Sequence, residues 1–524
     1  MGNTQRGFIL TSDQRDIAGK SCLEFWLSSA DGPIKVTTTA QQPLFFVSQQ
    51  DADQVQNILR QSQIPCTLKN LPLNRFDQQA VCAVYFPRTH QAYAAKERLR
   101  VQGITCYEAD IRLADRYLME RFICASADII GTPQQGVNYP SYAQCLLKPA
   151  QYTPHFSVLS IDIECSEHGE LYSIGLAGPD YQKVLMIGDA QDGPDWIQWV
   201  SNEQALLQCF IAEVKQTDPD ILIGWNVVNF DFRLLIERAQ RYNLKLTLGR
   251  GGEAVYWRDA PNEVNQGYIS MPGRVVIDGI DALKTATYQF SSFSLEFVAQ
   301  ALLGKGKLSE DVNDRLAQIK HDFLHAKVKL AEYNLQDCQL VLDIFDKTKV
   351  LDFLTLRSQL TGLELNRVGG SVAAFVNLYL PKLHRAGYIS PNRPIDGGLA
   401  SPGGYVMTSA PGLYRNVLVL DFKSLYPSII RTFKIDPLGL VEGLLQPEKG
   451  IQGFKSAIFS RDKHFLPDII TSLWQQRDTA KRNNDSARSQ AIKILMNSFY
   501  GVLGSGGCPF YDTRLASSIT LRGH

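Results

Sequence analysis

The segment VLVLDFKSLYPSII, Val417 to Ile430, determines how the rest of the chain is interpreted. Its first four residues, Val417 to Leu420, are apolar on both faces, which predicts a buried strand. Pro427 suits the first turn of a following helix, where its missing N–H needs no partner. Asp421 lies between the two, and a carboxylate at the end of a buried strand needs a cation or backbone N–H groups as partners. The segment therefore predicts a strand, a helix, and between them an acid that either binds a divalent cation or caps the helix.

The longer pattern D-x-x-S-L-Y-P-S-I-I, which begins at Asp421, resembles motif A of the family B DNA polymerases. In that family the Asp holds catalytic magnesium, and the Tyr lies beneath the sugar of the incoming nucleotide. The resemblance implies these two roles for Asp421 and Tyr426.

The composition limits the class of protein. A chain of 524 residues is too long for a single core. Its 53 basic and 53 acidic residues balance, so a DNA-binding surface must be a local patch of positive charge. The ten cysteines form no C-x-x-C pair, which indicates reduced thiols and no structural zinc. Neither a signal peptide nor an apolar span of roughly 18 residues is present. We therefore expect a soluble, cytoplasmic protein that does not contact membranes.

The first 150 or so residues alternate short apolar runs with turns. Two segments with helical periodicity, 52–61 and 89–101, interrupt these runs, which predicts a mixed α/β domain. The polar segment from Gly131 to Pro154 contains Gly and Pro and is interpreted as a linker.

Three later segments carry acids at places where metal ligands are common. FSVLSIDIE, Phe156 to Glu164, predicts a strand with Asp162 and Glu164 on the same side. Such a pair is either a divalent-cation site or two surface acids. A second strand, ILIGWN at 221–226, precedes a helix that begins near Asp231. A helix at 326–348 places Tyr333 and Asp337 on one face.

In order and spacing, D-I-E, N-V-V-N-F-D and Y-N-L-Q-D resemble the three exonuclease motifs of the proofreading domain of DNA polymerases, which has a ribonuclease H-like fold. The resemblance implies that the metal is held by Asp162, Glu164, Asp231 and Asp337. It implies that Tyr333 orients the attacking water and that Asn226 contacts the substrate. The expected cofactor is Mg²⁺ or Mn²⁺, with two ions about 4 Å apart in each active site.

Between the second and third motifs, the segment from Gly249 to Gly273 predicts a protruding β-hairpin. Trp257 and Tyr268 either stack on bases or pack across the hairpin. Asp278 follows another predicted strand and is interpreted as a structural acid. Farther along, the segment 403–405, Gly-Gly-Tyr, resembles the short glycine motif that links the exonuclease and polymerase modules of this family, or is a plain linker.

Two helices are predicted at 466–487 and 488–502, joined near the polar tip at 483–485. The segment KILMNSFYG, Lys493 to Gly501, resembles motif B of the same family, whose finger helices bring positive charge to the triphosphate. The resemblance implies that the phosphates contact Arg477, Lys481 and Lys493, that Asn497 lies beside them, and that Tyr500 packs near the nascent base pair.

The resemblance implies a multi-domain α/β fold with four parts. These are a mixed α/β domain at 1–150, a ribonuclease H-like 3′→5′ exonuclease domain at 151–360, a partial palm with motif A at 361–435, and finger helices with motif B at 436–524. Segments such as GGSVAAF, HRAGY and SPGGYV, taken in order, most resemble the bacterial DNA polymerase II branch of this family. Motif C, an acidic Y-x-D-T-D hairpin, is not found, because the nearest segment, Tyr511-Asp512-Thr513, is followed by Arg514. We therefore expect a truncated polymerase that retains exonuclease activity and cannot polymerise.

The expected function is DNA-directed DNA synthesis with proofreading, in replication or repair. The expected partners are primer-template DNA, single-stranded 3′ ends, deoxynucleoside triphosphates, and a sliding clamp bound by residues beyond His524. The expected location is the bacterial cytoplasm, in association with the nucleoid. Two alternatives stay open: a stand-alone metal-dependent 3′→5′ exonuclease in which Asp421 is vestigial, and a non-catalytic DNA-binding module.

Overall fold

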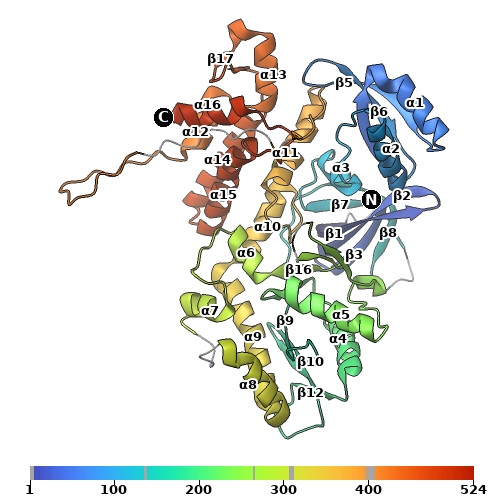
Figure 1. Ribbon diagram of the computed structural model, residues 1–524, viewed down its shortest axis with the longest axis vertical. Coiled ribbons are helices and arrows are strands. Elements are labelled where there is room, and N and C mark those ends of the chain that lie inside the picture. The colour runs from blue at the N-terminus through green and yellow to red at the C-terminus, as the bar shows by residue number, and fades with distance from the viewer. Residues whose placement is uncertain are drawn as a thin grey trace.

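The computed structural model describes residues 5–134, 138–261, 263, 266–305, 312–395, 397 and 407–523. Figure 1 shows three regions along the molecule. A β-rich N-terminal region lies beside the long helices α10 and α11, a sheet covered by helices occupies one end, and a bundle of C-terminal helices occupies the other. The predicted multi-domain α/β architecture is confirmed.

The N-terminal region is built on a closed five-stranded barrel, with the strand order β1-β2-β3-β8-β7. Apolar side chains that alternate along the strands fill its interior, as Ile34 and Val36 do on β3. The short helix α3 packs against the barrel through Leu113 and Tyr117. The bounds are β1 (Gln5–Ile17), β2 (Lys20–Ser29), β3 (Gly32–Thr38), β7 (Ser126–Gln134), β8 (Ser141–Pro149) and α3 (Leu113–Met119).

The predicted linker from Gly131 to Pro154 is wrong, because it contains the end of β7 and all of β8. Strand β8 pairs antiparallel with β7 and parallel with β3. The pairing register shifts where Gln144 adopts a positive φ of 53°. This bulge puts Tyr142 and Cys145, three positions apart, on the buried side. The extra residue hides the period-two pattern that would have revealed a strand.

A smaller α/β unit is inserted between β3 and β7. Its three strands have the order β4-β6-β5. Helices α1 and α2 cover one face of this sheet through Val55, Leu59, Ala95 and Leu99, and they have the predicted bounds. The bounds are β4 (Leu44–Ser48), α1 (Ala52–Gln61), β5 (Thr67–Asn74), β6 (Ala80–Tyr85) and α2 (Thr89–Val101).

The second region is a six-stranded sheet with the order β12-β11-β10-β9-β13-β16. Strands β9, β10 and β11 are antiparallel neighbours, while β13 and β16 run parallel to β9. This is the predicted ribonuclease H-like topology. The strands are β9 (Val158–Cys165), β10 (Leu171–Gly178), β11 (Tyr181–Ile187), β12 (Ile197–Val200), β13 (Ile221–Gly224) and β16 (Val275–Asp278).

The two faces of β9 differ because of its alternating sequence. Leu159, Ile161 and Ile163 join the apolar core beneath helices α4 and α5. The opposite side, which carries Asp162 and Glu164, faces helix α9. The helices around this sheet are α4 (Glu203–Thr217), α5 (Arg233–Arg241), α6 (Gly279–Thr285), α7 (Leu295–Leu303), α8 (Val312–His325) and α9 (Lys327–Thr348).

The C-terminal region is mainly helical and has its own apolar core. The predicted pair of finger helices is confirmed as α14 and α15, which meet at the turn 483–485, where the carboxylate of Asp485 accepts a bond from Arg488 N–H. The bounds are α10 (Val350–Thr361), α11 (Ser371–Arg385), α12 (Leu425–Phe433), α13 (Pro437–Leu445), β17 (Ile451–Gln452), β18 (Ile458–Phe459), α14 (Leu466–Arg482), α15 (Ser486–Leu503) and α16 (Thr513–Gly523).

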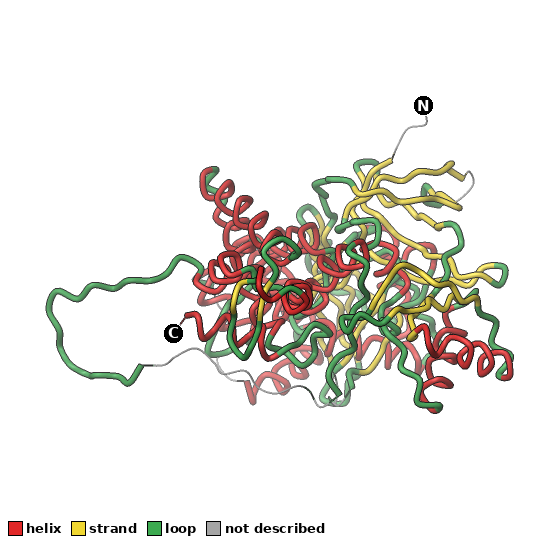
Figure 2. The backbone as a smooth tube through the Cα atoms, turned by 90° about the horizontal axis from the view of Figure 1, so that it is seen from above, coloured by secondary structure: helices red, strands yellow, loops and turns green. Residues whose placement is uncertain are grey.

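The predicted buried strand from Val417 to Leu420 is wrong in this structure. These residues form a loop and are between 64% and 90% exposed. Figures 1 and 2 show that the segment before α12 extends away from the helices. No strand among the described residues lies alongside it. A single extended run has no partner for its N–H and C=O groups, so it stays in water.

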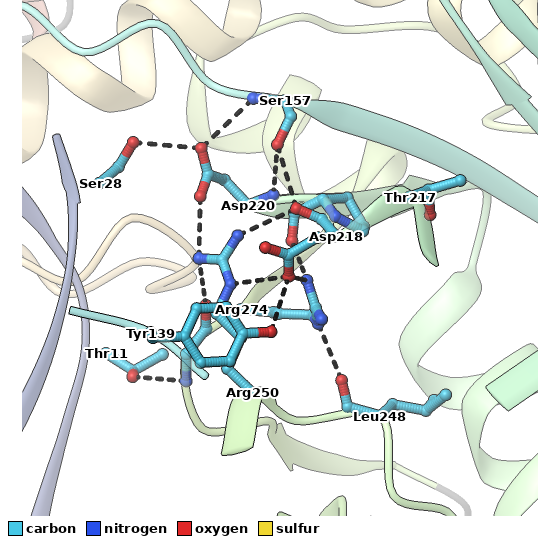
Figure 3. A network of polar contacts seen from close by, with 12 residues as sticks. Thr11, Ser28, Tyr139, Ser157, Thr217, Asp218, Asp220, Leu248, Arg250 and Arg274 are labelled. Carbon is cyan, nitrogen blue, oxygen red and sulfur yellow. Dashed lines mark hydrogen bonds and ion pairs between the residues drawn. The ribbon is translucent and has the colours of Figure 1, made fainter. Parts of the chain in front are cut away.

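A buried polar network joins the barrel to the six-stranded sheet (Figure 3). The side chains of Arg250 and Arg274 are only 1% exposed, and both form ion pairs with Asp218, at 3.0 and 2.6 Å. Arg250 also pairs with Asp220 at 2.9 Å, and Asp220 accepts a bond from Ser28 of the barrel at 3.1 Å. Each buried charge therefore has a partner, which fixes the start of β13 against the N-terminal region.

Candidate active site

Three carboxylates meet where β9 faces α9. Asp162 and Glu164 come from β9 and Asp337 from α9, and one oxygen of each lies within 4.8 Å of the others. Glu164 and Asp337 are buried and Asp162 is half-buried. Three acids this close repel one another unless cations lie between them, and carboxylate oxygens are the ligands that Mg²⁺ and Mn²⁺ prefer. The donor set therefore fits the predicted divalent metal.

Asp231 lies next to this group but is not part of it. It belongs to a π-helical turn, Val227–Phe232, and Ile163 N–H of β9 donates to its Oδ1 at 3.1 Å. Burial, and then the charge of Asp162, raise the pKa of Asp231 well above its ordinary value. The charges of Asp162 and Asp231 thus repel each other, and the role of Asp231 as a metal ligand stays a prediction.

The two other residues predicted for this site lie on α9 and at the end of β13. Tyr333 lies one helical turn before Asp337 on α9 and packs beside Tyr172 and Phe323. Asn226 follows β13 in the left-handed conformation, with φ 57° and ψ 27°, and is exposed. Tyr333 and Asp337 thus lie on the same face of α9, and the Asn226 side chain is accessible to a ligand.

One buried residue of the site was missed from the sequence. Asn334 is 0% exposed, and its Nδ2 donates to Asp162 Oδ2 at 2.7 Å. Ser173 Oγ of β10 donates to Asn334 Oδ1 at 3.0 Å. The only sequence signal was an Asn between Tyr333 and Asp337, on the buried side of a helix.

The predicted hairpin is confirmed as β14 (Tyr256–Asp259) and β15 (Gly267–Ser270). The Trp257 ring lies over Gly267, where a Cβ would be 2.3 Å from it, so Trp257 packs across the hairpin. Tyr268 is 49% exposed, with the Arg258 guanidinium 4.8 Å from its ring centroid.

The hairpin lines a cleft of about 660 Å³. Asn229 Oδ1 accepts a bond from Gly267 N–H at 3.0 Å, which joins the hairpin to the π-helical turn.

Asp278 has the structural role that the sequence predicts. It ends β16 and caps α6, since its Oδ1 accepts a bond from Ile280 N–H at 2.9 Å. Burial, and then the charge of Asp281, raise the pKa of Asp278 to about 6.

A second group of predicted residues meets between α12, α14 and α15. The rings of Tyr426 and Tyr500 have centroids 4.3 Å apart and an interplanar angle of 34°. Arg477 donates to Ser424 Oγ at 3.1 Å, just before α12. Lys481, Lys493 and Asn497 are exposed on the same two finger helices. The structure thus brings the two tyrosines into contact and leaves the charges of Lys481 and Lys493 exposed on the two finger helices.

Among the residues that the structure describes, Asp421 belongs to no group of three side chains that could hold a metal ion. It lies on the exposed loop three residues before Ser424. Across the part of the chain that the structure describes, the only group of three acidic, His or Cys ligands is the one at Asp162. Asp512 pairs with Arg514 at 2.7 Å and caps α16, which agrees with its exclusion as a motif C acid. The Gly-Gly-Tyr segment at 403–405 lies outside the described residues.

No described helix has both the length and the apolarity needed to cross a bilayer.

Comparison with known proteins supports the resemblance to the family B DNA polymerases. The model of the DNA polymerase family B exonuclease domain matches residues 104–298, and that of DNA polymerase family B matches residues 368–524. DNA polymerase II of Escherichia coli (strain K12) is 47% identical over 527 aligned residues, which cover 99% of this chain and 67% of that protein. A DNA polymerase of Thermococcus sp. (strain 9oN-7) is 27% identical and matches 84% of this chain.

The fold agrees as well. The family B DNA polymerase of Pyrobaculum calidifontis has a TM-score of 0.79 at 22% identity, over 98% of this chain and 70% of that one. The chain spans about two thirds of the Escherichia coli protein and 56% of the Thermococcus protein. Taken with the acid cluster and the sheet topology, these matches show that the chain belongs to DNA polymerase family B and contains its exonuclease domain.

Proposed function

We propose that this protein is a DNA-directed DNA polymerase with a 3′→5′ proofreading exonuclease, which acts in replication or repair. The observation that supports the exonuclease is the group of three carboxylates within 4.8 Å at Asp162, Glu164 and Asp337. The proposed substrates of this site are single-stranded and mismatched 3′ ends. The proposed cofactor is Mg²⁺ or Mn²⁺, with two ions in the site.

In the exonuclease the metal would be held by Asp162, Glu164 and Asp337, with Asp231 as the fourth acid. When bound, the ions lower the pKa of a water and stabilise the departing 3′ oxygen. Tyr333 lies on the same face of α9 as Asp337 and orients the attacking water through its hydroxyl group. Asn226 and the exposed Tyr268 ring hold the last nucleotides of the strand, by hydrogen bonding and by stacking.

For the polymerase, the proposal is supported by the contact between Tyr426 and Tyr500. Tyr426 supports the sugar of the incoming nucleotide, and Tyr500 packs against the nascent base pair. The positive charges of Arg477, Lys481 and Lys493 bind the triphosphate and stabilise the charge that develops on the leaving group. Asp421 is the proposed metal ligand from this part of the chain, and Asn497 lies beside the phosphates. A stand-alone exonuclease would need none of these residues.

Association with a sliding clamp and a cytoplasmic, nucleoid-associated location stay predictions from the sequence. The same applies to the division of the chain at about residues 150, 360 and 435.

The exonuclease is tested by changing Asp162→Ala together with Glu164→Ala. We expect the release of nucleotides from a single-stranded 3′ end in Mg²⁺ to fall about a thousandfold or more, since each factor of ten corresponds to roughly 1.4 kcal/mol of lost transition-state stabilisation. Asp346→Ala is the matched control, because this acid lies on α9 and is 81% exposed. Nuclease rates of the double variant that equal those of the unmodified protein would refute the site.

A further inference from the structure

A buried amide connects the two elements that carry the acid cluster. Asn334 lies on α9, three residues before Asp337, and its Nδ2 donates to Asp162 Oδ2 of β9 at 2.7 Å. These two residues are separated by 172 positions in the sequence. The contact therefore fixes one oxygen of Asp162 relative to the helix that supplies Asp337.

Chemistry determines which way the amide of Asn334 points. An ionised Asp162 can only accept hydrogen bonds, so the NH₂ group must face it. The amide oxygen then faces β10, where the hydroxyl of Ser173 donates to it at 3.0 Å. Ser173 is fully buried, so its hydroxyl supplies the amide oxygen with a donor inside the protein.

The pairing of β10 with β9 explains how the amide fits. Ser173 is directly opposite Glu164, and Gly175 is directly opposite Asp162. A Cβ at Gly175 would lie 3.0–3.1 Å from the side-chain amide atoms of Asn334. The two small residues on β10 thus leave the space that Asn334 occupies beside the acids.

We propose that Asn334, held by Ser173 and accommodated by Gly175, is a positioning residue that presets the Asp162 carboxylate for a divalent cation. This inference rests on the proposed exonuclease function. A neutral amide suits the task, because it orients one carboxylate oxygen without cancelling the charge that attracts the metal. A lysine at this place would neutralise Asp162 and compete with the cation.

The first measurement is Mn²⁺ binding to the protein without DNA, followed by electron paramagnetic resonance. Removing a residue that orients a metal ligand typically weakens metal affinity about 10- to 100-fold, and we expect this range for Asn334→Ala. In nuclease assays the Mn²⁺ concentration that gives half the maximal rate should rise by a similar factor. The rate at saturating Mn²⁺ should return to within a few-fold of the original.

Two further variants test the other parts of the arrangement. Ser173→Ala removes one hydrogen bond and should weaken Mn²⁺ binding less, roughly 2- to 10-fold. Gly175→Ala should displace the amide and weaken binding as Asn334→Ala does. Gln339→Ala is the matched control, because this amide also donates to a carboxylate on α9, Asp343 Oδ1 at 3.1 Å, but at an exposed position. It should leave Mn²⁺ affinity unchanged.

The outcomes separate this inference from the function on which it rests. If Asn334→Ala binds Mn²⁺ like the unmodified protein while Asp162→Ala with Glu164→Ala does not, the positioning role is wrong and the exonuclease proposal stands. If the double variant keeps its Mn²⁺ affinity, the metal site and this inference both fail. If Asn334→Ala does not fold, Ser173→Ala decides the question, and an unchanged affinity in that variant overturns the inference.

Discussion

Asp436 shows how much one buried side chain can organise. Its Oδ1 accepts bonds from Phe465 and Leu466 N–H, at 3.1 and 2.7 Å, at the start of α14. Its Oδ2 accepts bonds from Gly439 N–H of α13 at 2.7 Å and from the Tyr379 hydroxyl at 2.8 Å. A single carboxylate therefore caps two helices and holds them against α11.

We expect Asp436→Ala to destabilise α13 and α14 by about 3 kcal/mol, because three buried donors and one part-buried donor lose their acceptor. Amide hydrogen exchange over 437–482 should then become roughly a hundredfold faster. The control is Asp485→Ala, since Asp485 caps α15 through one bond to Arg488 N–H and is exposed. Its loss should cost about 1 kcal/mol. Equal effects of the two changes would show that Asp436 is an ordinary cap.

At the scale of elements, α11 is held to the N-terminal region by a buried ion pair. His384 Nε2 lies 2.9 Å from Glu108 Oε1, and His384 Nδ1 contacts Glu120. Burial alone would lower the pKa of His384, but the charges and hydrogen bonds of the two glutamates outweigh it and raise the pKa to about 9. Burial would raise the pKa of Glu108, but His384 and then Arg116 lower it to about 2. Both residues are therefore charged at neutral pH.

This pair makes stability depend on pH in a defined direction. The pKa of His384 is higher in the folded state than the usual value of about 6.5, so its contribution is complete below pH 6.5 and is lost as the pH rises through 9. Urea unfolding should show that His384→Gln is less stable than the unmodified protein by an amount on the order of 2 kcal/mol at pH 7, and equally stable at pH 10. His155→Gln, at an exposed position, is the control. A difference that stays constant from pH 7 to pH 10 would contradict the assignment.

The elements also show which features of the fold could be predicted from the sequence. Strand β9 and helix α9 were predicted because their apolar residues follow clear periods. Their acids were assigned to a metal site because the surrounding motifs resemble those of the proofreading exonucleases. Strand β8 was missed because its bulge at Gln144 breaks the alternation. The role of Asn334 was missed for another reason. Its contact with Asp162 depends on how α9 packs on the sheet and on the absence of a side chain at Gly175. Neither feature can be predicted from the local sequence pattern.

At the scale of the whole molecule, the two candidate sites differ in how many of their acidic metal ligands the described residues bring together. The proposed exonuclease acids lie on one sheet and on the helices that pack against it. This sheet is joined to the barrel through Asp220, which pairs with Arg250 and accepts a bond from Ser28 (Figure 3). At the proposed polymerase site, Tyr426 contacts Tyr500, and Arg477 donates to Ser424 just before α12. Asp421, in contrast, lies on an exposed loop, outside the one three-ligand acidic group found among the described residues.

A protein made of residues 1–524 alone should therefore degrade DNA from the 3′ end and fail to extend a primer. Two-metal phosphoryl transfer needs ions held between at least two carboxylates, and Asp421 alone cannot fix that geometry. The measurement uses a primed template, all four deoxynucleotides and Mg²⁺, with the Asp162→Ala and Glu164→Ala changes present to suppress degradation. The same DNA with the unmodified protein controls for activity, since it should be shortened. Template-directed extension by the double variant would mean that these residues contain a second polymerase ligand, and that the loop carrying Asp421 moves to meet it when DNA binds.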